Sequence, residues 1–251
     1  MRVGEWRRCD DPAPMLRHLG RGASARKRRL FVVACCRRLA HLLVHEASRD
    51  AVEVAEQFAD GLASDGERQQ AFERAYGIYQ LISHAFIEPL REESPSFAEA
   101  IITAGVHPYA ATDAAEAAAA VVDLSARWLD AQIIGAVAAG WAAATGDHAD
   151  DAARTSERAA QAALVRDIFG DTFSAPALDR ARLTPAVASI ARAAYEARAL
   201  PSGHLDADRL AVLADALEEA GCADEAILGH LRSPGPHVRG CRALDLVLGK
   251  S

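Results

Sequence analysis

The sequence predicts an all-α protein with roughly ten helices in an orthogonal or stacked helical bundle. Three observations predict this class. Alanine, the best intrinsic helix former, dominates the apolar residues. The alternation of apolar and polar residues that is typical of half-buried strands is missing from every stretch of useful length. Apolar residues recur instead every three to four positions, between Ser, Thr or Asp starts and Gly or Pro stops.

The first half of the chain carries four predicted helices. Asp11 precedes a proline at the first helical position, and Ser24 stands before a long apolar run, so both are expected N-caps. The predicted ranges are 11–20, 24–45, 48–61 and 65–86. Three prolines then predict an irregular connection over 88–112 that encloses a short helix at 96–104.

The second half begins with an alanine-rich helical segment over 113–145, where Asp113 and Glu116 have the spacing of a capping box. Thr184-Pro185 repeats the cap-plus-proline pattern, and residues 201–203 are typical of a linker. The further predicted helices cover 150–169, 184–200, 208–220, 224–231 and 237–248.

The charge is unevenly spread along the chain. Residues 1–50 hold 12 Lys+Arg against 5 Asp+Glu, and the other residues hold 16 against 30. We therefore expect a basic-faced N-terminal helical region over 1–110 and an acidic, alanine-rich helical region over 111–251, which together can form one continuous domain. The asymmetry indicates either a basic contact surface or two parts of the chain that attract each other.

The expected cellular compartment is inferred from three features that are missing from the sequence: a disulfide framework, a membrane span and a signal peptide. Five cysteines, an odd number without a C-x-x-C pair, argue against a disulfide framework. The apolar stretch 117–144 is interrupted by Asp123, Arg127 and Asp130, which a membrane span would resist. With no apolar segment of the signal-peptide kind in the first thirty residues, we expect a cytoplasmic protein without membrane contact.

A basic stripe is the first candidate site. If 24–45 is one helix, Arg26 lies in line with Arg37, Lys27 lies in line with Arg38, and His41 continues the row. Such a row could bind the phosphate backbone of a nucleic acid or an acidic protein partner. The alternative is a solvated helix face, or one paired internally with the acidic part of the chain.

Two cysteines and two histidines near the C-terminus are the second candidate site, and all four are zinc-capable: Cys222, His230, His237 and Cys241. On a helix over 237–248, His237 and Cys241 are four residues apart and could share one metal ion. A helix over 224–231 would instead hold Cys222 and His230 about 12 Å apart, too far for one tetrahedral site. The alternative is a buried cysteine beside a histidine that caps backbone carbonyls.

The turn before the last predicted helix is the third candidate. Two prolines and two glycines surround His237 and Arg239, and the amides at a helix start could hold an anion together with Arg239. The alternative, a turn that docks the last helix against the body, is the usual role of such a sequence.

Signatures of enzymes are missing from the sequence. It has no phosphate-binding glycine loop, no G-x-S-x-G elbow and no H-E-x-x-H motif. Our leading hypothesis is therefore a non-enzymatic helical module for protein interaction or scaffolding, with a protein partner and no cofactor. The alternatives are a zinc-binding protein that uses the C-terminal Cys/His cluster, and an anion or nucleic-acid binder that uses the basic stripe.

Both ends of the chain carry distinctive stretches, RKRRLFVVACCRR over 26–38 and a C-terminal stretch that includes PGPHVRGC over 234–241. Together they resemble an uncharacterised family of bacterial helical proteins that occurs in many copies in some genomes. The resemblance implies no activity. Two positions depart from the pattern, Arg242 where relatives would carry an aromatic residue and Leu231 where a cysteine is common. The second departure weakens the zinc hypothesis.

Overall fold

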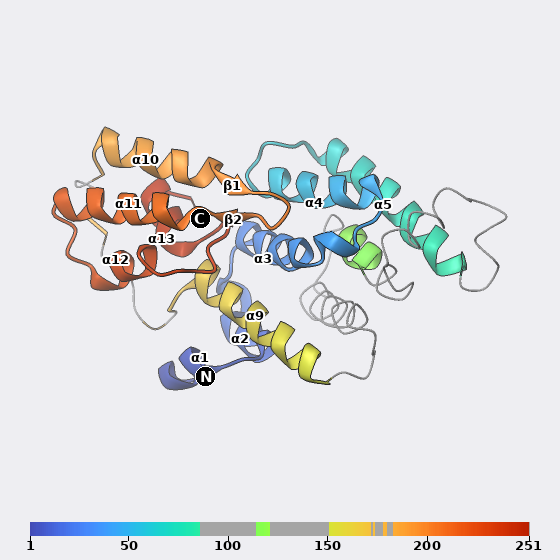
Figure 1. Ribbon diagram of the computed structural model, residues 1–251, viewed down its shortest axis with the longest axis horizontal. Coiled ribbons are helices and arrows are strands. Elements are labelled where there is room, and N and C mark those ends of the chain that lie inside the picture. The colour runs from blue at the N-terminus through green and yellow to red at the C-terminus, as the bar shows by residue number, and fades with distance from the viewer. Residues whose placement is uncertain (86–113, 121–150, 172, 174–177, 180–182, 251) are drawn as a thin grey trace.

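The computed structural model describes residues 1–85, 114–120, 151–171, 173, 178–179 and 183–250, which form an elongated arrangement of packed helices (Figure 1). Over these residues the protein is mostly helical, which confirms the predicted all-α class. The sheet found among them is a single antiparallel pair of short strands. In the same residues, no helix is both long enough and apolar enough to cross a membrane.

Residues 1–85 form helices α1 to α5 with short turns between them. The expected caps are present: the Asp11 carboxylate accepts a hydrogen bond from the Ala13 amide, and the Ser24 hydroxyl accepts one from the Lys27 amide. The elements are α1 (Val3–Arg8), α2 (Pro12–Leu19), η1 (Gly20–Gly22), α3 (Ala25–Arg38), η2 (Ala40–Leu42), α4 (Glu46–Ala59) and α5 (Asp65–Ala85).

Two of the later helices also begin at predicted caps. Thr184 and Asp224 each accept hydrogen bonds from amides of the first helical turn. The helix predicted over 208–220 has Asp206 as its N-cap instead, and this carboxylate accepts from the Asp208 and Arg209 amides. Residues 114–120 are helical, while the rest of the predicted segment 113–145 and the connection 88–112 lie outside the described residues. The elements are α9 (Asp151–Phe169), α10 (Pro185–Glu196), β1 (Arg198–Ala199), β2 (His204–Leu205), α11 (Ala207–Glu219), α12 (Glu225–Leu231) and α13 (Arg242–Leu248).

The helix expected over 184–200 was too long, since it ends at Glu196 and Arg198–Ala199 form strand β1. Two further predicted helices were wrong at one end. The helix expected over 24–45 ends at Arg38, where the backbone enters the 3-10 turn η2, and His45 caps the next helix. The helix expected over 237–248 begins only at Arg242. Before it the backbone is extended, and the His237 carbonyl accepts a hydrogen bond from the Leu205 amide at 2.9 Å. In both places apolar residues are buried by backbone that is not α-helical, which periodicity alone does not reveal.

The buried side chains form two clusters. The first is built by α1 to α5, residues 114–119 and α9, and α3 lies at its centre with residues 30–37 all buried. The second is built by α10 to α13. Helix α9 packs against α2, α3 and α13, so its last turn lies between the two clusters. The predicted division of the chain at residue 110 falls outside the described residues and stays a prediction.

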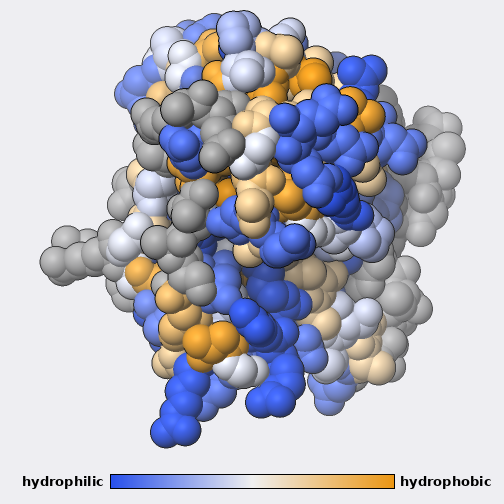
Figure 2. All heavy atoms as spheres, turned by 90° about the vertical axis from the view of Figure 1, so that its left-hand side faces the viewer, coloured by the Kyte–Doolittle hydropathy of each residue, from blue (hydrophilic) through white to orange (hydrophobic). Residues whose placement is uncertain are grey.

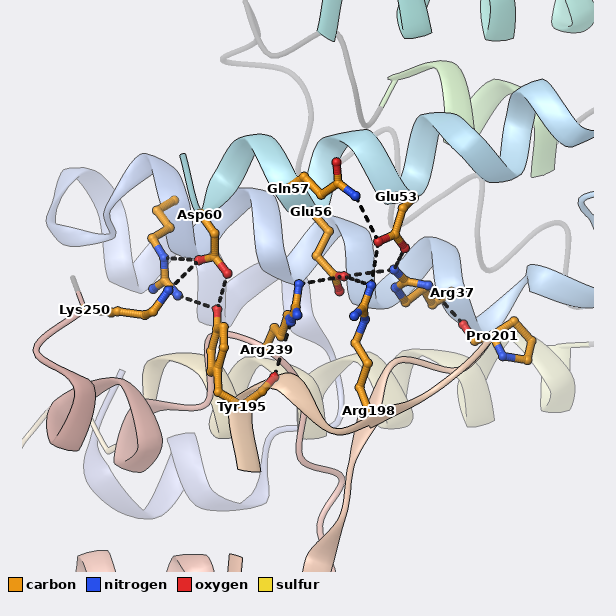
Figure 3. A network of polar contacts seen from close by, with 11 residues as sticks. Arg37, Glu53, Glu56, Gln57, Asp60, Tyr195, Arg198, Pro201, Arg239 and Lys250 are labelled. Carbon is orange, nitrogen blue, oxygen red and sulfur yellow. Dashed lines mark hydrogen bonds and ion pairs between the residues drawn. The ribbon is translucent and has the colours of Figure 1, made fainter. Parts of the chain in front are cut away.

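A buried polar network joins α4 to the C-terminal part of the chain (Figure 3). The Glu56 carboxylate accepts hydrogen bonds or ion pairs from three guanidinium groups: Arg37 at 3.0 Å, Arg198 at 2.8 Å and Arg239 at 3.3 Å. Glu53 binds Arg37 at 2.8 Å and Arg198 at 2.6 Å. Because a buried charge is costly without a partner, this network holds β1 and the loop before α13 against α4.

A second group of buried charges lies one turn further along α4. Asp60 accepts a hydrogen bond from the Tyr195 hydroxyl at 2.6 Å and binds Arg26 at 2.9 Å. Arg26 also binds Asp245 of α13 at 2.7 Å. Lys250 lies 3.4 Å from Asp60, and both are labelled in Figure 3. Residues from α3, α4, α10 and α13 therefore meet at one point.

We predict that Glu56→Gln destabilises the protein by about 3 kcal/mol or more, because it leaves three buried guanidinium groups around a neutral amide. Chemical denaturation followed by circular dichroism measures the change. The matched control is Asp215→Asn, which removes an exposed carboxylate that binds Arg232 and should change stability by less than about 1 kcal/mol. Equal effects of the two substitutions would contradict the prediction.

Asp60 should make stability depend on pH. Burial alone would raise the pKa of this carboxyl, but the Tyr195 hydroxyl and Arg26 outweigh it and hold the pKa below its ordinary value of 3.8. A carboxyl with a depressed folded-state pKa stabilises the fold fully above its unfolded pKa, and this contribution is lost as the pH falls through the folded pKa.

The free energy of unfolding is compared between the natural chain and Asp60→Asn from pH 7 downward. We expect the gap between the two proteins to be constant near neutrality and to shrink below about pH 4. A gap that stays constant through the acid range would show that Asp60 does not titrate as described.

Candidate metal centre

Four side chains with metal-binding atoms meet where the last turn of α9 faces α12 and the loop before α13. They are Asp167, His230, His237 and Cys241, and one ligand atom of each lies within 4.8 Å of the others. His230 Nε2 lies 3.0 Å from Asp167 Oδ1 and 3.2 Å from Cys241 Sγ. His237 Nδ1 lies 3.1 Å from the same Asp167 oxygen. The ligand atoms come from three separate segments of the chain.

The local sequence explains how the loop before α13 carries two of these groups. Helix α12 is seven residues long, so His230 stands in its last turn, three residues before Ser233. Gly235 then takes a φ of +93°, and a Cβ there would lie 2.8 Å from the His237 nitrogen. Only glycine adopts this conformation readily. The turn reverses the chain and brings His237 and Cys241 back toward His230.

Hydrogen bonds outside the cluster orient two of the ligands. The Nε2–H of His237 donates to the Ser233 carbonyl at 3.0 Å, which leaves Nδ1 directed at the cluster. The Val238 amide donates to Asp167 Oδ2 at 3.0 Å, which leaves Oδ1 directed at the cluster. Metal-ligating histidines commonly donate their second ring N–H to a carbonyl in this way, since the bond fixes the tautomer and the ring orientation.

The electrostatics of the cluster favour a cation. Burial raises the pKa of Cys241 well above its ordinary value, and the Asp167 charge raises it further. Burial opposes the charged form of Asp167, but hydrogen bonds from His230 and His237 outweigh it and lower its pKa. Burial lowers the pKa of His237, and Asp167 more than compensates, so the net shift is upward. A carboxylate and a thiol thus share one buried space, where a bound cation would stabilise both anionic forms.

The donor set and its spacing fit zinc. Imidazole nitrogen, thiolate sulfur and carboxylate oxygen are the ligands that Zn²⁺ takes, whereas Mg²⁺ and Ca²⁺ prefer oxygen alone. Tetrahedral bonds of normal length would place the ligand atoms roughly 3.3 to 3.8 Å apart, close to the contacts of 3.0 to 3.2 Å within the cluster. The ligand atoms all lie within 4.8 Å of one another, so an ion would need side-chain movements of about an ångström to be bound by all four.

The cluster is shielded by the protein on all sides except that of His230. The side chains of Asp167 and His237 are 2% and 1% exposed, whereas that of His230 is 30% exposed. A cavity of about 400 Å³ borders Asp167 and His230 and is lined on other sides by α1 and α13. Helices α1 and α12 both lie at the end of the molecule that faces the viewer in Figure 2. On this face, hydrophilic residues lie between patches of hydrophobic ones. This cavity gives an ion a route to the cluster.

Three of the four zinc ligands named from the sequence meet in the cluster, and one does not. Cys222 is buried among the apolar residues of the second cluster, at the other end of α12 from His230. Asp167 takes the fourth place, and it was not predicted from the sequence. The expectation that His237 and Cys241 share a helix face was wrong, since α13 begins after both of them. The signal for Asp167 was a lone acid within the apolar run ALVRDIF, on a helix with a buried face.

The residues of the predicted basic stripe face carboxylates of the same chain. Arg26 binds Asp60 and Asp245, and Arg37 binds Glu53 and Glu56. Arg38 forms a two-pronged contact with the buried Glu157, with its Nε 2.8 Å from one oxygen and its outer nitrogen 2.8 Å from the other. Lys27 donates to the Ile168 carbonyl at 2.7 Å. These contacts are of the internal kind that stood as the alternative to a surface stripe.

The two remaining candidate binding residues are His41 and Arg239, and they lie in different parts of the fold. His41 lies in η2 beyond the end of α3, so it does not continue the row on that helix, and its side chain is exposed. Arg239 is buried, with its guanidinium 3.3 Å from Glu56 and its Nε donating to the Tyr195 carbonyl at 3.4 Å. The turn around Arg239 thus docks against α4 and α10, the structural role that stood beside anion binding.

Comparison with known proteins adds no relative. No protein-family model, no curated protein and no solved structure matches this chain. The resemblance of the two end stretches to a bacterial multi-copy family therefore stays a prediction.

Proposed function

We propose that this protein binds one zinc ion through Asp167, His230, His237 and Cys241, and that the ion has a structural role. The observation that carries the proposal is the meeting of four donor atoms of the zinc-binding kinds within 4.8 Å, three of the four residues being buried. The ligand set differs from the one expected from the sequence by Asp167 in place of Cys222.

The number of ligands supports a structural rather than a catalytic ion. Structural zinc sites have four protein ligands, and catalytic sites have three with a position open for water or substrate. Here four protein groups surround the space, so a bound ion would be closed off. It would join α9, which belongs to the first buried cluster, to α12 and the loop before α13, which carry the second.

A structural ion is compatible with a non-enzymatic helical module that binds a protein partner, which remains the hypothesis drawn from the sequence. In that case the ion would act on the partner-binding surface indirectly, by fixing how the C-terminal helices pack against α9.

The first test is the zinc content of the purified full-length chain, measured by inductively coupled plasma mass spectrometry. We expect about one zinc ion per chain, and a loss of most of it in His237→Ala and Cys241→Ser. Cys222→Ala is the matched control, because it removes a nearby cysteine that lies outside the cluster and should keep its zinc. Substitution by Co²⁺ should give thiolate-to-metal absorption that Cys241→Ser lacks.

Two results would contradict the proposal. One is a chain that neither contains zinc as purified nor takes up Zn²⁺ or Co²⁺ added to it. The other is zinc that is lost in Cys222→Ala and retained in Cys241→Ser, which would assign the metal to different ligands.

The second test is thermal stability with and without a chelator. Because a structural ion contributes its binding energy to folding, removal of the metal with EDTA should lower Tm by about 5 °C or more, and added Zn²⁺ should restore it. Cys241→Ser should show little response to the chelator. A natural chain whose Tm is the same in EDTA and in excess Zn²⁺ would argue against a structural role.

A further inference from the structure

A second cavity, of about 540 Å³, lies where α2 and the start of α3 face the end of α9. It shares no lining residue with the metal centre. Its ionisable lining residues, among those that the structure describes, are all basic: His18, Lys27 and Arg242. A wall with cations and no carboxylate is suited to an anionic ligand.

The two strongest cations are held in place by the end of α9. The Lys27 ammonium donates to the Ile168 carbonyl at 2.7 Å, and Arg242 donates to the Phe169 carbonyl at 3.1 Å and to the Asp171 carbonyl at 2.6 Å. Asp245 lies 3.7 Å from Lys27, but Arg26 is closer to it at 2.7 Å. An ammonium has three N–H donors, so Lys27 retains donors for a ligand beyond the bond to Ile168.

Burial makes Lys27 receptive to a negative charge. Its side chain is 15% exposed, and burial lowers its pKa below the ordinary value. The ammonium would gain from a desolvated anion beside it, since water solvates it poorly.

The other lining residues and the volume of the cavity indicate the size of the ligand and its apolar part. Leu19, Ala23 and Phe169 supply apolar surface, and Ser24 stands at the N-cap of the 14-residue helix α3, whose amino end favours negative charge. The volume is within the range of sites for small organic molecules. An anion with three acceptor oxygens matches several cationic donors better than a single carboxylate does.

We propose that this cavity binds a phosphate group on a small organic molecule, with Lys27 and Arg242 against the phosphate and with Leu19 and Phe169 against the organic body. The proposal does not depend on the metal centre, and either can fail without the other.

The test is isothermal titration calorimetry of the full-length chain, as purified, with phenyl phosphate and separately with inorganic phosphate. We expect phenyl phosphate to bind, and Lys27→Met and Arg242→Met each to weaken it about tenfold, the loss typical of one charge-assisted hydrogen bond. Arg209→Met is the control, because Arg209 is an exposed arginine of α11 outside the cavity, and it should leave the affinity unchanged.

A blocking variant keeps the test decisive if the charge substitutions disturb the fold. Gly22 lines the cavity, and a Cβ added there would meet no atom within 4 Å, so Gly22→Trp should fill space without displacing the core. We expect it to abolish binding while the helical circular dichroism is unchanged.

The two probes distinguish the source of the phosphate. Tighter binding of phenyl phosphate supports an organic phosphate as ligand, and equal affinities would overturn that part and leave free phosphate. No binding of either probe, or binding that Gly22→Trp and Lys27→Met leave intact, would overturn the proposal as a whole.

Discussion

The structure depends on one constraint, which is that a carboxylate buried away from water needs a partner of opposite charge or several hydrogen-bond donors. Five carboxylates among the described residues have side chains that are 3% exposed or less: Glu56, Asp60, Glu157, Asp167 and Asp245. Four of them face arginines from distant segments of the chain.

Asp167 differs, because its neighbours are two imidazoles and a thiol. An arginine carries its charge at all relevant pH values, whereas these three groups need protons or a cation to balance the carboxylate. Asp167 therefore marks the place where a metal ion would do what arginine does elsewhere.

The same constraint explains the charge asymmetry of the sequence, because cations of the N-terminal segment pair with buried carboxylates of later helices. The basic N-terminal segment and the acidic remainder could have indicated a contact surface, or two parts that attract each other. Arg26 binds Asp245 across 219 residues of sequence, and Arg38 binds Glu157 across 119. In both cases a cation of α3 reaches a carboxylate of a later helix. The asymmetry is used, at these residues, to assemble the helices around α3.

Much of the fold could be predicted from the sequence, because helix starts depend on local chemistry. Ser24, Thr184 and Asp224 accept hydrogen bonds from the next turn's amides, and that requires only residues three positions away. The ends of helices were harder to predict. Arg38 ends α3 although the apolar pattern continues, because Leu42 is buried from a 3-10 turn as well as it would be from an α-helix. The short α1 was not predicted, because no Ser, Thr, Asp or Asn precedes it; the Arg2 amide at its N-cap position donates instead to the Glu5 carboxylate at 2.7 Å.

The candidate site was predictable only in part, for a related reason. Zinc-capable residues can be named from their chemistry, so His230, His237 and Cys241 were named together with Cys222, which lies outside the cluster. Which of them meet depends on tertiary structure: on the length of α12, on the turn at Gly235 and on the position of α9. Asp167 lies 63 residues before His230 and resembles any other acid on a helix. Only the packing of α9 against α13 and the loop before it gives this carboxylate its role.

The last turn of α9 connects the two proposed sites. Asp167 turns its side chain to the metal centre, while the next two residues turn their carbonyls to the cavity: Ile168 to Lys27, and Phe169 to Arg242. These carbonyls have no partner within the helix, as at any helix end, and cations there also oppose the negative end of the helix dipole. Gly170 then leaves the helix with a φ of +67°, and a Cβ at that position would collide with the Arg242 side chain. The metal centre and the anion cavity, although they share no lining residue, are held by the same turn of helix.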